Sequence, residues 1–131
     1  MSEENVELTR RAHDAFNRRD QDAFLALMDE KVEAQSRLAA LEGSYKGHDG
    51  VRRWWSDFLG VFPDYTTDIQ ELRDLGEVTL VHFQARGAAA GSGTPLLDPV
   101  WQPLRWRDGK CVWWRVCFTE AEALEAAGLS E

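Results

Sequence analysis

The segment Lys110–Phe118, KCVWWRVCF, constrains the fold most, because it has a strand-like composition but apolar side chains at both parities. Successive side chains of a β-strand point to opposite faces of a sheet, so a strand with one wet face alternates apolar and polar residues. The segment therefore predicts a strand that is covered on both faces. Its two sets of alternate positions are Val112, Trp114, Val116 and Phe118, and Cys111, Trp113, Arg115 and Cys117.

Length and charge limit the class of protein. The chain has 131 residues and a formal net charge of −8 at pH 7, so we expect one domain over residues 1–131 that buries its own core. The negative charge argues against nucleic-acid binding, which needs a basic surface. No apolar run approaches the ~18 residues of a membrane span, and the first residues, MSEENVELTRR, lack the apolar core of a signal peptide. We therefore expect a cytoplasmic protein.

The two cysteines, Cys111 and Cys117, are expected to stay reduced. Six residues of one strand at ~3.3 Å each put them about 20 Å apart. A disulfide needs Cα atoms within ~7 Å, so the two cannot pair within one strand. Two buried thiols are the expectation, and pairing with a second subunit is the alternative.

The first half of the chain predicts helices. Residues 3–18 place apolar side chains at helical spacing, and Asp20 is a candidate N-cap for a short helix over residues 21–29. A weaker strand candidate at 31–38 precedes a glycine-rich loop at 42–50. A third helix is predicted over residues 48–62, ending before Pro63. Its apolar stripe comprises Val51, Trp54, Trp55, Phe58 and Phe62.

From residue 65 onward the apolar period shifts towards two, which favours strands. Strands are predicted at 65–76 and 77–91, a loop at 92–99, and a hairpin over 100–118 whose turn is Asp108-Gly109. A short helix follows at 119–129, with Thr119 as its N-cap and Gly128 at its end. Helices followed by strands indicate an α+β fold with a mainly antiparallel sheet.

Four segments together resemble the SnoaL-like members of the NTF2-like superfamily: AFNRRDQDAF at 15–24, LEGSYKGHDGVRRWW at 41–55, RDGKCVWW at 107–114 and EALEAAGL at 122–129. The resemblance implies a cone, in which three N-terminal helices pack on a strongly curved, mainly antiparallel sheet and a short C-terminal helix follows. It also implies an apolar pocket at the open end of the cone and a homodimer through the outer sheet face.

The doubly apolar strand fits this arrangement, with one face towards the cone and the other towards a second subunit. Val112, Trp114, Val116 and Phe118 are expected to face inward, because they are uniformly apolar. The mixed set, with Trp113, Arg115 and Cys117, is then the expected dimer interface. The alternative is that Trp113 lies under a loop or under the C-terminal helix.

The resemblance covers isomerases, polyketide cyclases, dehydratases, epoxide hydrolases and binding domains, so the residues must decide the chemistry. The carboxylate base of the ketosteroid-isomerase pattern falls on Gln35 or Ser36, and the carboxylate of the cyclases falls on Thr119. None of these side chains can serve as a carboxylate base. The tyrosine of the isomerase pattern falls near Ala12. The familiar acid–base groups are therefore absent.

The histidines are the remaining candidates for acid–base chemistry. His48 is predicted at a helix N-terminus, where a neutral imidazole is favoured and could act as a base; the alternative is a surface or capping role. His82 lies in a polar file that faces either the cone or solvent, and His13 is expected to be a satisfied core residue. Three scattered histidines do not give the spacing of a metal site. With no phosphate or dinucleotide motif either, we expect no metal and no cofactor.

The sequence thus favours a small-molecule-binding protein with an apolar cone-shaped pocket and an apolar or polycyclic guest. One alternative is an isomerase or polyketide-cyclase-like enzyme that uses a histidine base. The other is a dimeric interaction module with a vestigial cavity. The residues expected to line the pocket are Gln35, Tyr45, Trp54, Phe58, Phe62, His82, Trp101, Trp114, Val116 and Phe118.

Overall fold

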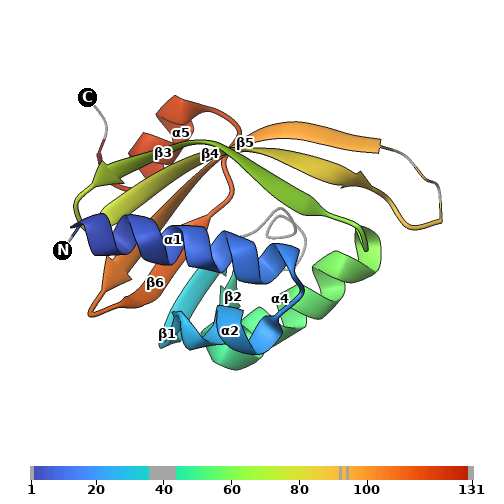
Figure 1. The fold of residues 1–131 in the computed structure, drawn as a ribbon, viewed down its shortest axis with the longest axis horizontal. Coiled ribbons are helices and arrows are strands. Elements are labelled where there is room, and N and C mark those ends of the chain that lie inside the picture. Colours follow the sequence, from blue (N-terminus) through green and yellow to red (C-terminus); the bar gives the residue numbers. More distant parts are fainter. Residues whose placement is uncertain (1, 36–43, 92, 94, 130–131) are drawn as a thin grey trace.

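The computed structural model describes residues 2–35, 44–91, 93 and 95–129. In this part of the chain the strands form a curved sheet, and helices pack against it (Figure 1). The elements are α1 (Ser2–Asn17), α2 (Gln21–Ala26), β1 (Met28–Gln35), β2 (Tyr45–Lys46), α4 (Gly47–Val61), β3 (Thr66–Leu75), β4 (Val78–Ala88), β5 (Pro95–Arg107), β6 (Lys110–Arg115) and α5 (Glu120–Ala126).

The described strands make one sheet of order β2-β1-β6-β5-β4-β3. The β1–β6 pair is parallel, and the β1–β2, β3–β4, β4–β5 and β5–β6 pairs are antiparallel. The predicted α+β fold with three N-terminal helices, a mainly antiparallel sheet and a short C-terminal helix is therefore confirmed. Among the described residues, no helix combines the length and the apolar character that crossing a membrane requires.

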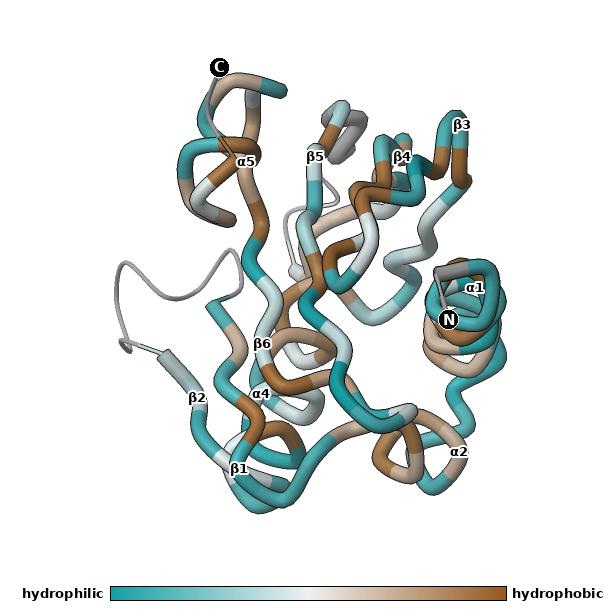
Figure 2. Tube along the Cα trace, turned by 90° about the vertical axis from the view of Figure 1, so that its left-hand side faces the viewer, coloured by the Kyte–Doolittle hydropathy of each residue, from teal (hydrophilic) through white to brown (hydrophobic). Residues whose placement is uncertain are grey.

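The sheet is covered on both faces by helices of the same chain. Val81 and Phe83 of β4 belong to the main core, which they share with residues of α1, α2 and α4. Leu80 points to the opposite face, as alternation requires, and packs with Cys117 and with Ala123 of α5. Figures 1 and 2 accordingly show α1 and α5 on opposite sides of the sheet.

Local signals in the sequence correctly predicted the caps and the hairpin turn. Asp20 caps α2 by accepting a hydrogen bond from the backbone N–H of Ala23, and Thr119 caps α5 by accepting one from Glu122. Asp108 and Gly109 have φ angles of 51° and 77°. Two consecutive positive φ angles are typical of a type I′ turn, which matches the twist of the strands that it joins.

The predicted alternation along β6 is wrong at its start. Cys111 pairs with Trp106, but Trp113 and Trp114 pair with Arg105 and Leu104, so the register shifts by one residue at Val112. Such a bulge places two residues of one strand opposite one residue of its partner. As a result Cys111 and Trp114 both belong to the main core, although strict alternation would put them on opposite faces.

The other end of the segment also differs from the prediction. Cys117 was expected at a dimer interface, but it is fully buried in the small core beneath α5. Phe118 was expected to face the cone, but its side chain is 47% exposed. Cys117 lies on the face opposite to Trp114, as alternation predicts, but α5 covers that face. Phe118 lies beyond the end of the strand at Arg115, where the alternation no longer fixes its direction.

Other element boundaries also differ from the predictions. Residues 95–99, predicted as loop, belong to β5 and pair with β4 as far as Ala88. Met28 and Asp29, predicted at the end of a helix, open β1, and Tyr45–Lys46 form a short strand within the predicted glycine-rich loop. Ser36, one of the two residues at the isomerase base position, lies outside the described residues.

Both thiols are free and buried. Burial raises the pKa of Cys111 to about 12 and that of Cys117 to about 11. A thiolate is therefore disfavoured at both positions near neutral pH, and neither cysteine has the character of a nucleophile.

Candidate functional site

A cavity of about 50 Å³ lies between the N-terminal helices and the inner face of the sheet. It is the place where the aromatic side chains of α1, α2 and α4 meet those of the strands. Its wall is mostly apolar, with a small polar section formed by three side chains. The lining residues are Ala12, His13, Phe16, Phe24, Trp54, Phe58, Tyr65, Thr67, Phe83, Gln102, Leu104, Trp114 and Val116.

Interlocked aromatic rings form the apolar wall. The Phe16 ring stacks on Trp54 with centroids 5.7 Å apart and meets the edge of Tyr65 at 5.9 Å. Trp54 in turn meets Trp114 of β6 at 5.0 Å with the rings 70° apart. Such edge and offset contacts are favourable beyond the area they bury. The wall therefore joins α1, α4, β6 and the segment before β3 into one packed unit.

His13, Thr67 and Gln102 form the polar section of the wall. His13 Nε2 lies 2.8 Å from Gln102 Oε1, and His13 Nδ1 lies 2.8 Å from Thr67 Oγ1. An amide oxygen only accepts, so Nε2 carries the proton and donates to Gln102. Nδ1 of the neutral ring then accepts from the Thr67 hydroxyl. The three side chains come from α1, β3 and β5.

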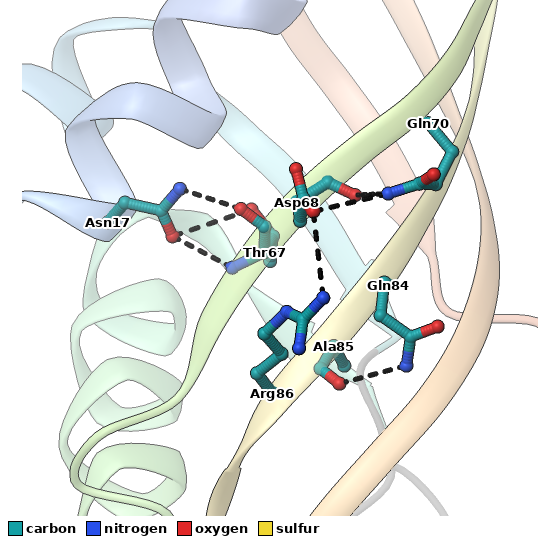
Figure 3. A network of polar contacts seen from close by, with 7 residues as sticks. All are labelled: Asn17, Thr67, Asp68, Gln70, Gln84, Ala85 and Arg86. Atoms are coloured by element: carbon teal, nitrogen blue, oxygen red, sulfur yellow. Dashed lines mark hydrogen bonds and ion pairs between the residues drawn. The ribbon is translucent and has the colours of Figure 1, made fainter.

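Asn17 at the end of α1 holds Thr67 in place (Figure 3). Its amide nitrogen donates to the Thr67 carbonyl at 2.9 Å, and its Oδ1 accepts from the Thr67 backbone N–H at 2.9 Å. Figure 3 shows the next residue, Asp68, on the other side of β3, where it approaches Arg86. The clamp fixes the backbone of β3 against α1, and Thr67 is thereby directed at His13.

Burial determines the charge state of His13. It lowers the pKa of His13 from 6.5 to about 4, and the hydrogen bond to Gln102 opposes this effect only in part. A buried imidazole loses the hydration that stabilises its charged form. His13 is therefore neutral at neutral pH, and its two ring nitrogens hold Thr67 and Gln102 in fixed positions at the cavity wall.

Two buried indole groups lack a hydrogen-bond partner within the described part of the chain. The Nε1 atoms of Trp54 and Trp114 have no hydrogen-bond acceptor among the described residues, although both side chains line the cavity. Trp54 and Trp114 are 6% and 2% exposed. An unsatisfied buried donor costs about 1–3 kcal/mol. Such groups are rare in native proteins and call for a specific explanation.

The structure brings four of the ten predicted pocket residues to this cavity: Trp54, Phe58, Trp114 and Val116. His82 and Trp101 stack on each other 4.0 Å apart, and Trp101 packs against the small core beneath α5. They therefore lie on the outer face, since β4 presents Val81 and Phe83 to the helices. The other predicted residues that do not line this cavity are Gln35, Tyr45, Phe62 and Phe118.

His48, the predicted catalytic base, does not line the cavity. Its Nε2 lies 2.8 Å from the backbone carbonyl oxygen of Met28. A carbonyl only accepts, so His48 donates this bond and ties the start of α4 to the start of β1. The contact gives His48 a structural role, and we propose no catalytic role for it.

Sequence reasoning missed the polar section of the cavity. His13 was predicted to be a satisfied core residue, and neither Thr67 nor Gln102 was singled out. The helical spacing of Phe16 with His13 did indicate that both lie on the inner face of α1. No local signal pairs His13 with Thr67 or Gln102, because these partners are separated from it by 54 and 89 positions in the sequence.

The fold and the cavity define a class: a cone-shaped α+β protein with a mostly apolar pocket between its helices and its sheet. The family model of the SnoaL-like domain matches residues 9–114. The chain therefore belongs to the SnoaL-like family, as its sequence segments implied. The comparison with curated proteins gave no match.

Solved structures share the whole architecture at low sequence identity. An NTF2-like protein of unknown function from Burkholderia pseudomallei has a TM-score of 0.81 at 22% identity, with 93% of this chain and 95% of that chain covered. TerC, co-crystallised with polyporic acid, has a TM-score of 0.79 at 20% identity, with 93% and 98% covered. A Catenulispora acidiphila protein with a ketosteroid isomerase-like fold, in complex with trimethylamine, has a TM-score of 0.76 at 16% identity, with 94% and 93% covered.

Proposed function

We propose that the protein binds a small, largely apolar molecule in the cavity beneath α1. The observation that carries this proposal is the combination of an aromatic wall with a polar section formed by His13, Thr67 and Gln102. Ligand sites are typically apolar hollows in which a few fixed polar groups set the orientation of the guest. Two proteins of similar fold were crystallised with small molecules, which supports binding as a use of this architecture.

The size of the cavity favours a ligand much smaller than the polycyclic guest that the sequence suggests. Pockets for drug-sized ligands measure about 300–1,000 Å³, whereas this cavity measures about 50 Å³. A polycyclic molecule would have to displace several interlocked rings, including Phe16 and Trp54. A guest of a few heavy atoms needs far smaller adjustments of the wall.

The charge state of His13 favours binding over general base catalysis. A general base works best when its pKa is close to the working pH, but burial lowers the pKa of His13 to about 4. Its Nδ1 is also engaged by Thr67. With both ring nitrogens engaged, the neutral ring has no free basic atom with which to remove a proton from a guest.

A cavity-filling substitution tests the proposed function. Cyclobutanone, a probe of five heavy atoms, should quench or shift the tryptophan fluorescence and saturate at one site per chain. Val116→Phe places a ring at the cavity wall and should weaken this binding at least tenfold. Val61→Phe makes the same change at a side chain that is 42% exposed and should leave binding unaltered. Binding by Val116→Phe as tight as by the wild type, with both variants folded, would refute the site.

The homodimer stays a prediction, and its expected interface is now smaller. With Cys117 beneath α5, Trp113 and Arg115 remain as the half-buried outer residues of β6. A half-exposed tryptophan on a sheet face is a common feature of subunit interfaces. Sedimentation equilibrium at micromolar concentration should give twice the chain mass of 14.9 kDa, and Trp113→Ser should shift the equilibrium towards one chain. A wild-type protein that sediments as a single chain would rule out the dimer.

A further inference from the structure

Two side chains of the cavity wall carry hydrogen-bond donors for which the described residues supply no acceptor. The Thr67 hydroxyl and both ring nitrogens of His13 are used within the polar section. The indole N–H groups of Trp54 and Trp114 have no acceptor among the described residues. Gln102 uses its amide oxygen for His13. Within the part of the chain that the structure describes, these two indole donors are therefore unsatisfied.

The two indole rings are neighbours in the cavity wall. Trp54 comes from α4 and Trp114 from β6, and their ring centroids are only 5.0 Å apart. A carbonyl oxygen has two lone pairs and can accept two hydrogen bonds. One such oxygen, or two in a single small molecule, could satisfy these two donors, for which the described residues supply no acceptor.

The described residues of the wall also carry no charge at neutral pH. None of the described residues lining the cavity is Asp, Glu, Lys or Arg, and His13 is neutral at neutral pH. An ion entering this cavity would lose its hydration without gaining an opposite charge, and that transfer is strongly unfavourable. A neutral guest avoids this penalty.

We infer that the cavity selects an uncharged molecule with a hydrogen-bond-accepting oxygen, such as a ketone or aldehyde, through the indole N–H groups of Trp54 and Trp114. This inference rests on the proposed function, because it names the chemical class of guest for the same site. It is distinct from that proposal, because an apolar cavity could equally bind a hydrocarbon.

A matched pair of probes tests the inference. Cyclobutanone and methylenecyclobutane share one ring and nearly one shape, but only the ketone has an accepting oxygen. The ketone should bind about tenfold more tightly, which is the effect of one well-made buried hydrogen bond. In protein with ¹⁵N-labelled tryptophan, six indole signals are expected. The ketone should move the signals of Trp54 and Trp114 downfield, and the hydrocarbon should not.

Single substitutions assign the donors. Trp114→Phe and Trp54→Phe should each reduce the preference for the ketone over the hydrocarbon several-fold, because each removes one N–H. Each substitution also changes the cavity volume, but this affects the binding of both probes similarly and largely cancels in the ratio of the two affinities. Trp55→Phe is the control, since Trp55 neighbours Trp54 on α4 but does not line the cavity; it should keep the full preference.

The outcomes separate the two proposals. Equal affinity for both probes overturns the inference and leaves the proposed function intact. No saturable binding of either probe overturns both. A ketone preference that survives both Trp54→Phe and Trp114→Phe overturns the assignment of the donors. Cyclobutanecarboxylate should bind least well of the three probes, and tighter binding of this anion would contradict selection for an uncharged guest.

Discussion

Phe16→Ala is expected to lower the free energy of unfolding by about 3–5 kcal/mol. Phe16 is 5% exposed and lies at the centre of the aromatic wall. Its ring contacts Phe24, Trp54, Trp55 and Tyr65, which come from α2, α4 and the segment before β3. The substitution removes the ring and leaves a void that these stiff neighbours can fill only in part.

Urea unfolding at neutral pH measures this loss. Val61→Ala is the control, because Val61 is 42% exposed and lies outside the main core. An exposed side chain of this kind changes stability by no more than ~0.5 kcal/mol. A loss below about 1 kcal/mol for Phe16→Ala would mean that the wall relaxes around the void, against the tight ring packing described above.

Acid should destabilise the protein through His13. Its pKa is about 4 in the folded protein against 6.5 as the ordinary value, so the unfolded chain binds the additional proton at intermediate pH. Stability then rises with pH across this window and is fully present above the unfolded pKa. Between about pH 7 and about pH 4.5, the imidazole alone should remove roughly 2 kcal/mol from the free energy of unfolding.

His13→Gln isolates this contribution from the carboxylates that titrate in the same range. Glutamine keeps a donor and an acceptor near Thr67 and Gln102 but does not titrate. The variant should lose roughly 2 kcal/mol less stability than the wild type over that pH interval, as measured by urea unfolding at each pH. Parallel stability profiles for the two proteins would show that His13 is not buried as a neutral ring.

Local features of the sequence were sufficient to predict most of the fold. Asp20, Thr119 and the Asp108-Gly109 turn act through their own backbone neighbours, so their effects can be read without the tertiary structure. The four segments that resemble the SnoaL-like family also predicted the overall architecture. The bulge at Val112 has no such signal, because it arises where β6 adapts to the strands on either side.

The candidate site was less predictable, because it too depends on contacts between residues that are distant in the sequence. Trp54 and Phe58 were found because a helical stripe of aromatics indicates the inner face of α4. The partners of His13 come from β3 and β5, which the fold alone brings together. His82 and Trp101 were wrongly predicted to line the pocket, because the character of a strand residue does not show whether its face of the sheet turns towards the cavity or towards α5. Here α5 covers the second face.

The position of β6 in the sheet also affects the tendency of the protein to aggregate. KCVWWRVCF is a segment of high β-propensity, and such a segment at an open sheet edge would invite pairing with other chains. It lies instead between β1 and β5, while β3 forms one edge and carries Asp68, Glu71, Arg73 and Asp74. Charged edge strands discourage intermolecular pairing. The fold thus places the aggregation-prone strand β6 inside the sheet and the charged strand β3 at its edge.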